Sequence, residues 1–247
     1  YKALDSIKLK KYSEVDKKQF ALTFYSKSEF KSSELFDKEL KKKVSNFFAD
    51  EKRSSLFLSK ELTGLKGDFL VLRDFNKNKS EYKKYAWMKG LFANLDKYAV
   101  KNAVIYADTS HLFKDDNFLF DLAKTAEKVS YRYTDTNPNT KKELILKNVS
   151  LAIENASAAQ KKVVELGYNV GSGANTARNL GDRPANHATP SYIANAVKGL
   201  AKDIGGFSVE ILEEKDMQKL GMGCLLSVSR GSIEPAKLVT MQYKGGK

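Results

Sequence analysis

The side chains best suited to catalysis are few in this chain of 247 residues, and they lie far apart. His111 and His187 are the two histidines, and neither has a partner at the spacing of metal ligands, so each is interpreted as structural. Cys224 is the single cysteine, which excludes an internal disulfide and fits a reducing compartment. Its apolar neighbours in Gly-Met-Gly-Cys-Leu-Leu predict a buried small hydrophobe rather than a nucleophile.

Two acidic segments follow an expected strand at residues 103–107, where α/β folds tend to bind ligands. They are Asp108-Thr-Ser and the pair Asp115-Asp116, and we interpret both as loop residues because no second motif accompanies them. The chain has no P-loop, no Gly-x-Ser-x-Gly elbow, no His-Glu-x-x-His motif and no pair of cysteines. These patterns therefore assign no catalytic, cofactor-binding or metal-binding residue.

Residues 1–150 alternate strand-like and helix-like segments. Short buried strands are expected at residues 21–26, 69–72 and 103–107, which are rich in β-branched and aromatic residues. The amphipathic patterns between and after them predict three helices, with these apolar positions: Leu35, Leu40, Val44, Phe47 and Phe48; Tyr85, Met88, Leu91, Phe92 and Leu95; Leu119, Leu122, Ala123 and Ala126. This alternation predicts an α/β domain with a largely parallel sheet, followed by a surface loop at residues 136–142.

Small residues dominate from residue 152 onward and predict a linking helix at residues 151–182. Gly167, Gly171 and Ala174 share one face of this helix, which permits close backbone packing. A dinucleotide-binding loop at Gly171 and Gly173 is disfavoured, because no strand precedes them and Thr176 stands where the third glycine of that motif belongs.

Residues 183–247 predict the start of a second α/β domain. Thr189 and Pro190 mark the beginning of a helix whose apolar stripe continues to Ile204. A strand from Phe207, a short helix at residues 213–220 and a strand at residues 238–243 are expected after it. We expect this domain to be incomplete within the 247 residues. The segment 178–197 is interpreted as a hinge rather than a catalytic loop.

The net charge of +13 is a weak indication of nucleic-acid binding, because 37 of the 43 basic residues are lysine and 6 are arginine. Residues 1–150 carry 31 basic and 21 acidic side chains, which is +10 of that charge. No apolar run is long enough to cross a bilayer and no signal-peptide pattern is present, so the expectation is a cytoplasmic protein that does not contact membranes.

Several segments from residue 155 onward resemble the junction and the start of the catalytic domain in the leucyl aminopeptidase (cytosol aminopeptidase) family. The main segment is Asn175-Thr-Ala-Arg-Asn-Leu-Gly-Asp-Arg-Pro-Ala-Asn-His-Ala-Thr-Pro190. Residues 209–212, Lys219-Leu-Gly-Met-Gly223, Leu226-Ser-Val-Ser-Arg-Gly-Ser232 and the closing Tyr243-Lys-Gly follow at matching places. The first 150 residues match faintly, mostly through Tyr131-Arg-Tyr-Thr-Asp.

The resemblance implies an exopeptidase of two domains. Members have a macro-like amino-terminal α/β domain, a linking helix and a catalytic domain with two divalent metal ions, manganese or zinc, and are usually assembled as hexamers. They remove N-terminal residues from peptides, with leucine-type preference. The family's metal ligands lie in Gly-Lys-Gly-x-Thr-Phe-Asp and Asn-Thr-Asp-Ala-Glu-Gly-Arg segments, and neither occurs here. Lys247 lacks that context, so no catalytic, metal or cofactor residue is carried over.

Two functions follow as expectations. The first is a metal-dependent aminopeptidase whose metal site lies beyond residue 247, so that residues 1–247 alone hold no metal pair and hydrolyse no peptide. The alternative is a non-catalytic assembly or DNA-binding module that acts through the basic amino-terminal domain.

Overall fold

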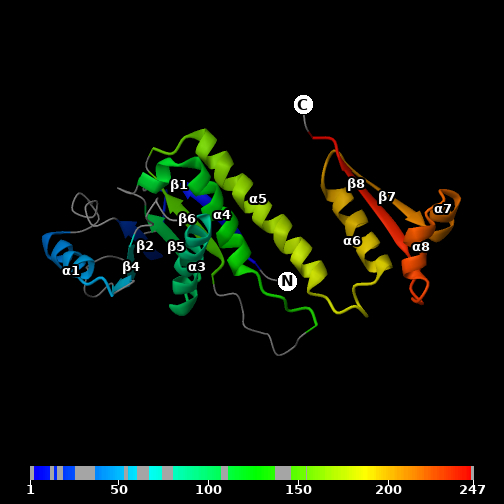
Figure 1. Ribbon diagram of the computed structural model, residues 1–247. Helices are drawn as coiled ribbons and strands as arrows, with labels where there is room; N and C mark the ends of the chain where they lie inside the picture. The colour runs from blue at the N-terminus through cyan, green and yellow to red at the C-terminus, as the bar shows by residue number, and fades with distance from the viewer. Residues whose placement is uncertain are drawn as a thin grey trace. The chain divides into compact units, whose positions relative to one another are not determined.

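The computed structural model describes residues 3–11, 14–15, 19–25, 37–52, 55–59, 67–73, 80–106, 111–136, 146–153 and 155–245. The chain divides into two compact units, Tyr1–Ala177 and Arg178–Lys247, here called unit 1 and unit 2. Figure 1 labels the helices and strands of both units. The predicted domain boundaries at residues 150 and 182 stay a prediction.

Unit 1 contains a six-stranded sheet with the strand order β1-β6-β5-β2-β4-β3. Its neighbouring strands run parallel, except that β3 is antiparallel to β4. The strands are β1 Ser6–Lys10, β2 Phe20–Tyr25, β3 Ser55–Leu58, β4 Phe69–Arg73, β5 Asn102–Tyr106 and β6 Asn148–Ala152. The three strands predicted from the sequence are β2, β4 and β5. The other three were missed because β1 and β6 mix polar with apolar residues and β3 has four residues.

Helices cover both faces of this sheet. Alternate residues of a strand point to opposite faces, so one strand can contribute apolar side chains to the core on each side. On β5, Ala103 and Ile105 join the core cluster formed with α3 and α4, whereas Val104 joins the cluster formed with α1. The helices are α1 Lys38–Ala49, α3 Glu81–Lys97 and α4 Asp116–Ser130. The predicted apolar face of α4 is confirmed, and α1 buries the predicted residues from Leu40 to Phe48. On α3 the predicted residues from Met88 to Leu95 are buried, but the prediction is wrong for Tyr85, which lies in the first turns of the helix and is 40% exposed. Leu35 and most of the predicted loop at residues 136–142 lie outside the described residues.

Helix α5, Ala158–Gly181, is the long helix predicted by the small residues. Figure 1 shows it as the long yellow-green ribbon beside α4. Gly167 and Gly171 are buried against α4, which confirms the predicted close packing on this face, while Ala174 is partly buried. The sequence did not predict α4 as the partner. The combination of a mostly parallel sheet and covering helices confirms the mixed α/β class.

Unit 2 consists of α6 Pro190–Asp203, β7 Phe207–Glu213, α7 Glu214–Lys219, α8 Gly223–Ser229 and β8 Lys237–Tyr243. Strands β7 and β8 pair antiparallel along their whole lengths. Helix α8 was not expected from the sequence. The apolar stripe of α6 is only partly buried: Val197 is covered, whereas Leu200 and Ile204 are 36% and 43% exposed.

None of the helices in the described part of the chain combines the length and the apolar character needed to cross a bilayer.

Candidate functional site

Two of the acidic residues that follow β5, Asp115 and Asp116, lie at the start of α4. Asp115 is the N-cap of α4, and its Oδ1 accepts a hydrogen bond of 2.9 Å from the backbone N–H of Asn117. Asp116 lies in the first turn, where a negative charge is favoured by the helix dipole. Asp108 lies outside the described residues. The prediction that both are loop residues is therefore wrong for Asp116, which begins α4, whereas Asp115 caps the helix from outside it.

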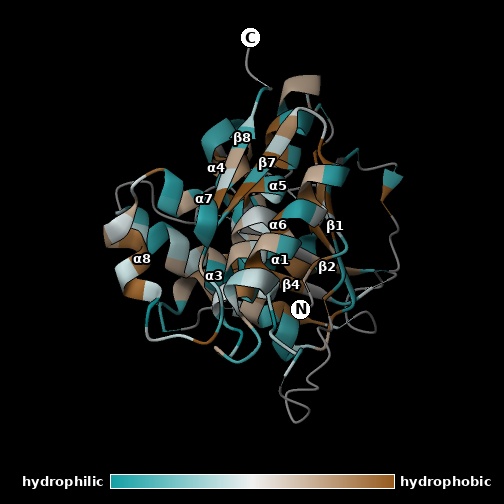
Figure 2. Cartoon of the chain, turned by 90° about the vertical axis from the view of Figure 1, so that its right-hand side faces the viewer, coloured by the Kyte–Doolittle hydropathy of each residue, from teal (hydrophilic) through white to brown (hydrophobic). Residues whose placement is uncertain are grey.

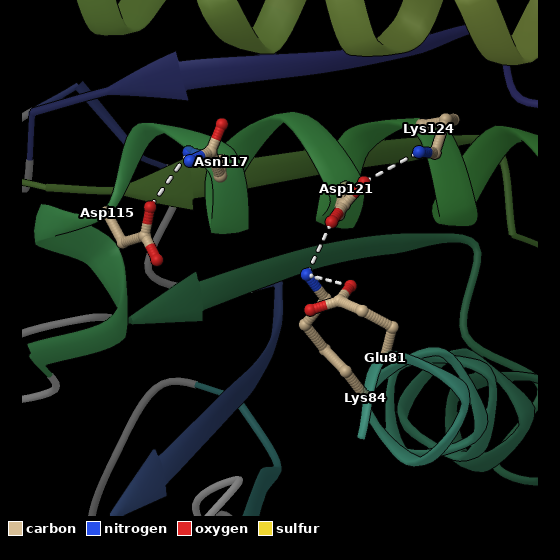
Figure 3. A network of polar contacts seen from close by, with 6 residues as sticks. All are labelled: Glu81, Lys84, Asp115, Asn117, Asp121 and Lys124. Carbon is tan, nitrogen blue, oxygen red and sulfur yellow. Dashed lines mark hydrogen bonds and ion pairs between the residues drawn. The ribbon is translucent and has the colours of Figure 1, made fainter. Parts of the chain in front are cut away.

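A lysine of α3 joins that helix to α4 (Figure 3). The Lys84 ammonium lies 2.7 Å from Asp121 Oδ2 and 2.6 Å from Glu81 Oε2, while Lys124 lies 2.6 Å from Asp121 Oδ1. Burial disfavours the charged lysine, but the hydrogen bonds to the two carboxylates outweigh it, so the pKa of Lys84 is raised. Burial likewise opposes ionisation of Asp121, and its bonds to the two lysines outweigh this and lower its pKa. This ion-pair network fixes α3 against α4.

A buried carboxylate holds α5 against α4. Glu127 is 2% exposed, and its Oε1 accepts a hydrogen bond of 3.1 Å from Asn175 Nδ2. The same Nδ2 donates to the Glu127 backbone oxygen at 2.9 Å, and the Leu4 backbone N–H donates to Oε2 at 3.1 Å. The Tyr168 hydroxyl on α5 donates a hydrogen bond of 3.2 Å to the carbonyl oxygen of the same Leu4. One carboxylate therefore organises α4, α5 and the segment before β1.

Burial is the largest influence on the pKa of Glu127. It raises the pKa of this carboxyl, and the hydrogen bonds from Asn175 and from the Leu4 N–H only partly offset it. Sequence reasoning missed both Glu127 and Asn175. A signal for them exists, since Glu127 lies four residues after Ala123 and Asn175 four residues after Gly171, each continuing a buried helix face.

Glycines make the close packing of α4 and α5 possible. A Cβ at Gly171 would lie 2.9 Å from both the Lys124 carbonyl oxygen and Glu127 Cβ. A Cβ at Gly167 would collide with the Phe120 carbonyl oxygen. The packing of α5 on α4 therefore depends on Gly167 and Gly171, which have no side chain, and on the side-chain amide of Asn175.

The segment before α6 is fixed by capping rather than by catalytic side chains. Thr189 is the N-cap of α6, and its hydroxyl accepts a hydrogen bond of 3.2 Å from the Tyr192 backbone N–H. The Arg183 guanidinium lies over the Tyr192 ring, 4.7 Å from its centroid. Pro190 occupies the first helical turn, as predicted. These contacts set the start of α6, and the hinge interpretation of the segment stays a prediction.

The remaining candidate side chains do not gather into a site. His187 is exposed, and its backbone N–H donates to the Pro184 carbonyl at 2.8 Å. The prediction that Cys224 is buried is wrong: its thiol is exposed in the first turn of α8, next to Leu225, which is itself 44% exposed. Within the described ranges, no three histidine, cysteine or acidic residues come together in a way that could hold a metal ion.

The comparisons with known proteins agree with one another. Residues 175–247 match the family model of the cytosol aminopeptidase family, catalytic domain. A probable cytosol aminopeptidase of Aromatoleum aromaticum is 32% identical over 207 residues, which cover 80% of this chain and 41% of that protein. One from Nitrosococcus oceani is 40% identical over 129 residues, which cover 50% of this chain and 25% of that protein.

Two solved structures share the fold. A mutant of tomato leucine aminopeptidase superposes with a TM-score of 0.73 at 17% identity, covering 100% of this chain and 53% of that chain. A bottromycin maturation enzyme in complex with manganese gives a TM-score of 0.65 at 16% identity, covering 92% of this chain and 45% of its own. This chain thus spans about half or less of the length of the proteins it matches.

The described contacts define an α/β protein in which a long helix is fixed to the sheet-bearing unit by a buried carboxylate and closely spaced glycines. Residues 175–247 thus match the catalytic domain of the cytosol aminopeptidase family, and the chain is similar to a member of that family over 80% of its length.

Proposed function

We propose that this chain supplies the amino-terminal unit and the first part of the catalytic domain of a metal-dependent aminopeptidase. The complete enzyme would release N-terminal residues from peptides, with leucine-type preference. One observation carries the proposal: residues 175–247 match the catalytic-domain family model, and the alignment with the Aromatoleum aromaticum relative extends this likeness over 80% of the chain.

We place the two divalent metal ions, manganese or zinc, outside residues 1–247. The described residues do not offer a donor set for such an ion, since no three candidate ligands meet. The manganese named for the bottromycin maturation enzyme supports manganese as the first ion to test.

The role that we propose for the described residues is positional. Asn175, at the first residue of the family match, is bound to Glu127 in unit 1. Thr189 and Pro190 fix where α6 begins within the matched segment. Through its bonds to Glu127, Asn175 would anchor the first residues of the matched segment to α4.

We also propose a cytoplasmic location, which the names of the relatives support, and a hexameric assembly, which rests on the resemblance alone. The alternative of a DNA-binding module has little to support it. It rests on the charge of residues 1–150, while Lys84 and Lys124 in that part of the chain are occupied by acidic partners.

A chimera tests the proposed function. Residues 1–247 would replace the aligned segment of the Aromatoleum aromaticum relative, and hydrolysis of leucine p-nitroanilide would be measured with added Mn²⁺. We expect metal-dependent release of p-nitroaniline, abolished by a chelator. A folded chimera that stays inactive, while the parent relative is active in the same assay, would contradict the proposal.

A further inference from the structure

A groove of about 480 Å³ lies between β1 and the first half of α5, inside unit 1. Figure 1 shows the blue β1 arrow beside the long α5 ribbon. Ile7 and Val164 form the apolar wall of the groove, and both are buried in the core cluster on this face of the sheet. Lys161 and Glu165 lie one turn apart on α5 and are exposed, so their charges offset each other. The groove therefore has an apolar wall and no net charge from α5.

Strand β1 is an edge of the sheet: within the described residues, β6 is its one neighbour. The Ser6 backbone N–H donates to the Lys147 carbonyl at 3.3 Å, and the Lys10 carbonyl accepts from the Ile153 N–H at 2.9 Å. Successive residues of a strand direct their backbone groups to opposite edges, so every second residue, beginning with Ile7, directs its N–H and C=O away from β6. An edge of this kind can accept a further strand.

The lysines of β1 determine which strand would pair there. Lys8 is exposed and Lys10 partly exposed, and alternation places both on the face opposite to Ile7. Figure 2 shows by colour that hydrophilic and hydrophobic residues mix along β1. The acidic residue at the start of the groove, Asp5, already lies 3.9 Å from the Lys147 ammonium. Because residues opposite each other on paired strands interact, acidic side chains are favoured opposite the two lysines and an apolar one opposite Ile7.

A second copy of β1 is a poor partner for this edge. Two antiparallel β1 strands that overlap fully from Ser6 to Lys10 place Lys8 opposite Lys8 of the second copy. Like charges directly opposite one another destabilise a strand pair, and lysines on edge strands oppose self-association in this way. The charges therefore favour an acidic segment over a second copy.

We propose that the edge of β1 binds an extended segment of a partner protein in which acidic residues alternate with small apolar residues. The segment adds to the sheet of unit 1 as a further strand and bonds to the outward backbone groups of Ile7. Its acidic side chains lie opposite Lys8 and Lys10, and its apolar side chains enter the groove beside Val164. The site lies wholly in unit 1 and does not depend on the proposed function.

Binding of two peptides to the 247-residue chain tests the charge pattern by fluorescence anisotropy. The probes are fluorescein-labelled Thr-Glu-Val-Glu-Val-Thr-amide and its counterpart with lysine in place of glutamate. We expect the glutamate peptide to bind roughly tenfold more tightly. Lys8→Glu combined with Lys10→Glu should reverse the preference, a gain of binding to the lysine peptide that misfolding cannot produce. Lys38→Glu combined with Lys42→Glu, at exposed positions of α1, should leave the preference unchanged.

Methylation of the peptide amides tells strand addition from charge attraction alone. With valine opposite Ile7, an antiparallel peptide bonds to Ile7 through its valine N–H groups, and a parallel one through its glutamate N–H groups. Of two peptides, N-methylated at both valines or at both glutamates, one should therefore lose roughly tenfold or more in affinity and the other should not. Loss in both or in neither would overturn strand addition.

Hydrogen exchange locates the bound peptide. The Ile7 amide should exchange quickly in the free chain and roughly tenfold or more slowly with saturating glutamate peptide. Slow exchange without peptide would overturn the proposal, because another part of the chain would then occupy the edge. So would a dimer in sedimentation that the glutamate peptide dissociates, since the occupant would then be a second copy. Equal responses of the two double variants, or no binding of the glutamate peptide up to about 1 mM, would also contradict it.

Discussion

Replacing Gly171 by alanine should destabilise unit 1, although alanine is the better helix former. In a helix interior, Gly→Ala alone stabilises by about 1 kcal/mol. At Gly171, however, the new Cβ would lie 2.9 Å from the Lys124 carbonyl oxygen and from Glu127 Cβ, closer than real Cβ atoms approach such neighbours. Neither atom is the end of a flexible side chain, so α5 must move away from α4, which also strains the bond between Asn175 and Glu127.

Gly173 provides the matched control, two residues further along the same helix. A Cβ there would meet nothing within 4 Å, so Gly173→Ala should stabilise by about 0.5–1 kcal/mol. Helix propensity contributes equally to both variants. The difference between them therefore isolates the packing cost, about 2 kcal/mol within the usual range of about 1–3 kcal/mol for overpacked sites.

Trp87, the single tryptophan, reports on this difference because it packs on the core of unit 1. Its fluorescence during thermal and denaturant unfolding should give a melting temperature for Gly171→Ala that is roughly 4–8 °C below that of Gly173→Ala. Equal melting temperatures for the two variants would refute the close packing of α5 on α4.

The remaining predictions concern the two carboxylates and the cap of α6. The pKa of Glu127 is raised by burial, so its contribution to stability is fully present below its ordinary value of 4.5 and is lost as pH rises through the folded value. Glu127→Gln should therefore become more stable relative to wild type as the pH is raised above 4.5 in urea unfolding; a constant difference would contradict this. The pKa of Asp121 is lowered, so its contribution is present above 3.8 and lost as pH falls through the folded value. Asp121→Asn should cost about 1–2 kcal/mol at pH 7, and the cost should vanish in acid. Thr189→Ala should cost unit 2 about 1 kcal/mol in amide-exchange measurements on α6, whereas Thr189→Ser should not; equal losses would rule out the cap.

The periodicity of the sequence predicted the helices of unit 1 and three of its strands, because apolar residues recur there at positions that end in the core. It missed β1, whose pairing with β6 depends on residues more than a hundred positions away. It also missed Glu127, since a charged residue on a buried helix face contradicts the pattern unless its partners are known. Asn175, the Leu4 N–H and the tight fit of Gly171 become visible only once α5 lies on α4.

Cys224 illustrates the opposite error. Its apolar neighbours predicted burial, and that argument assumes a core for them to enter. In unit 2 only Ala194, Val197 and Met217 are buried apolar residues among those described, so the pattern around Cys224 has no interior to fill. An apolar pattern predicts a surface that needs covering, and the residues that cover it can belong to another part of the polypeptide.

The most direct test of the account is hydrolysis of leucine p-nitroanilide with Mn²⁺, compared between the 247-residue chain and the chimera. The account predicts no turnover above buffer for the 247-residue chain and metal-dependent turnover for the chimera. Metal-dependent hydrolysis by the purified 247-residue chain would contradict it, because the catalytic groups would then lie within residues 1–247.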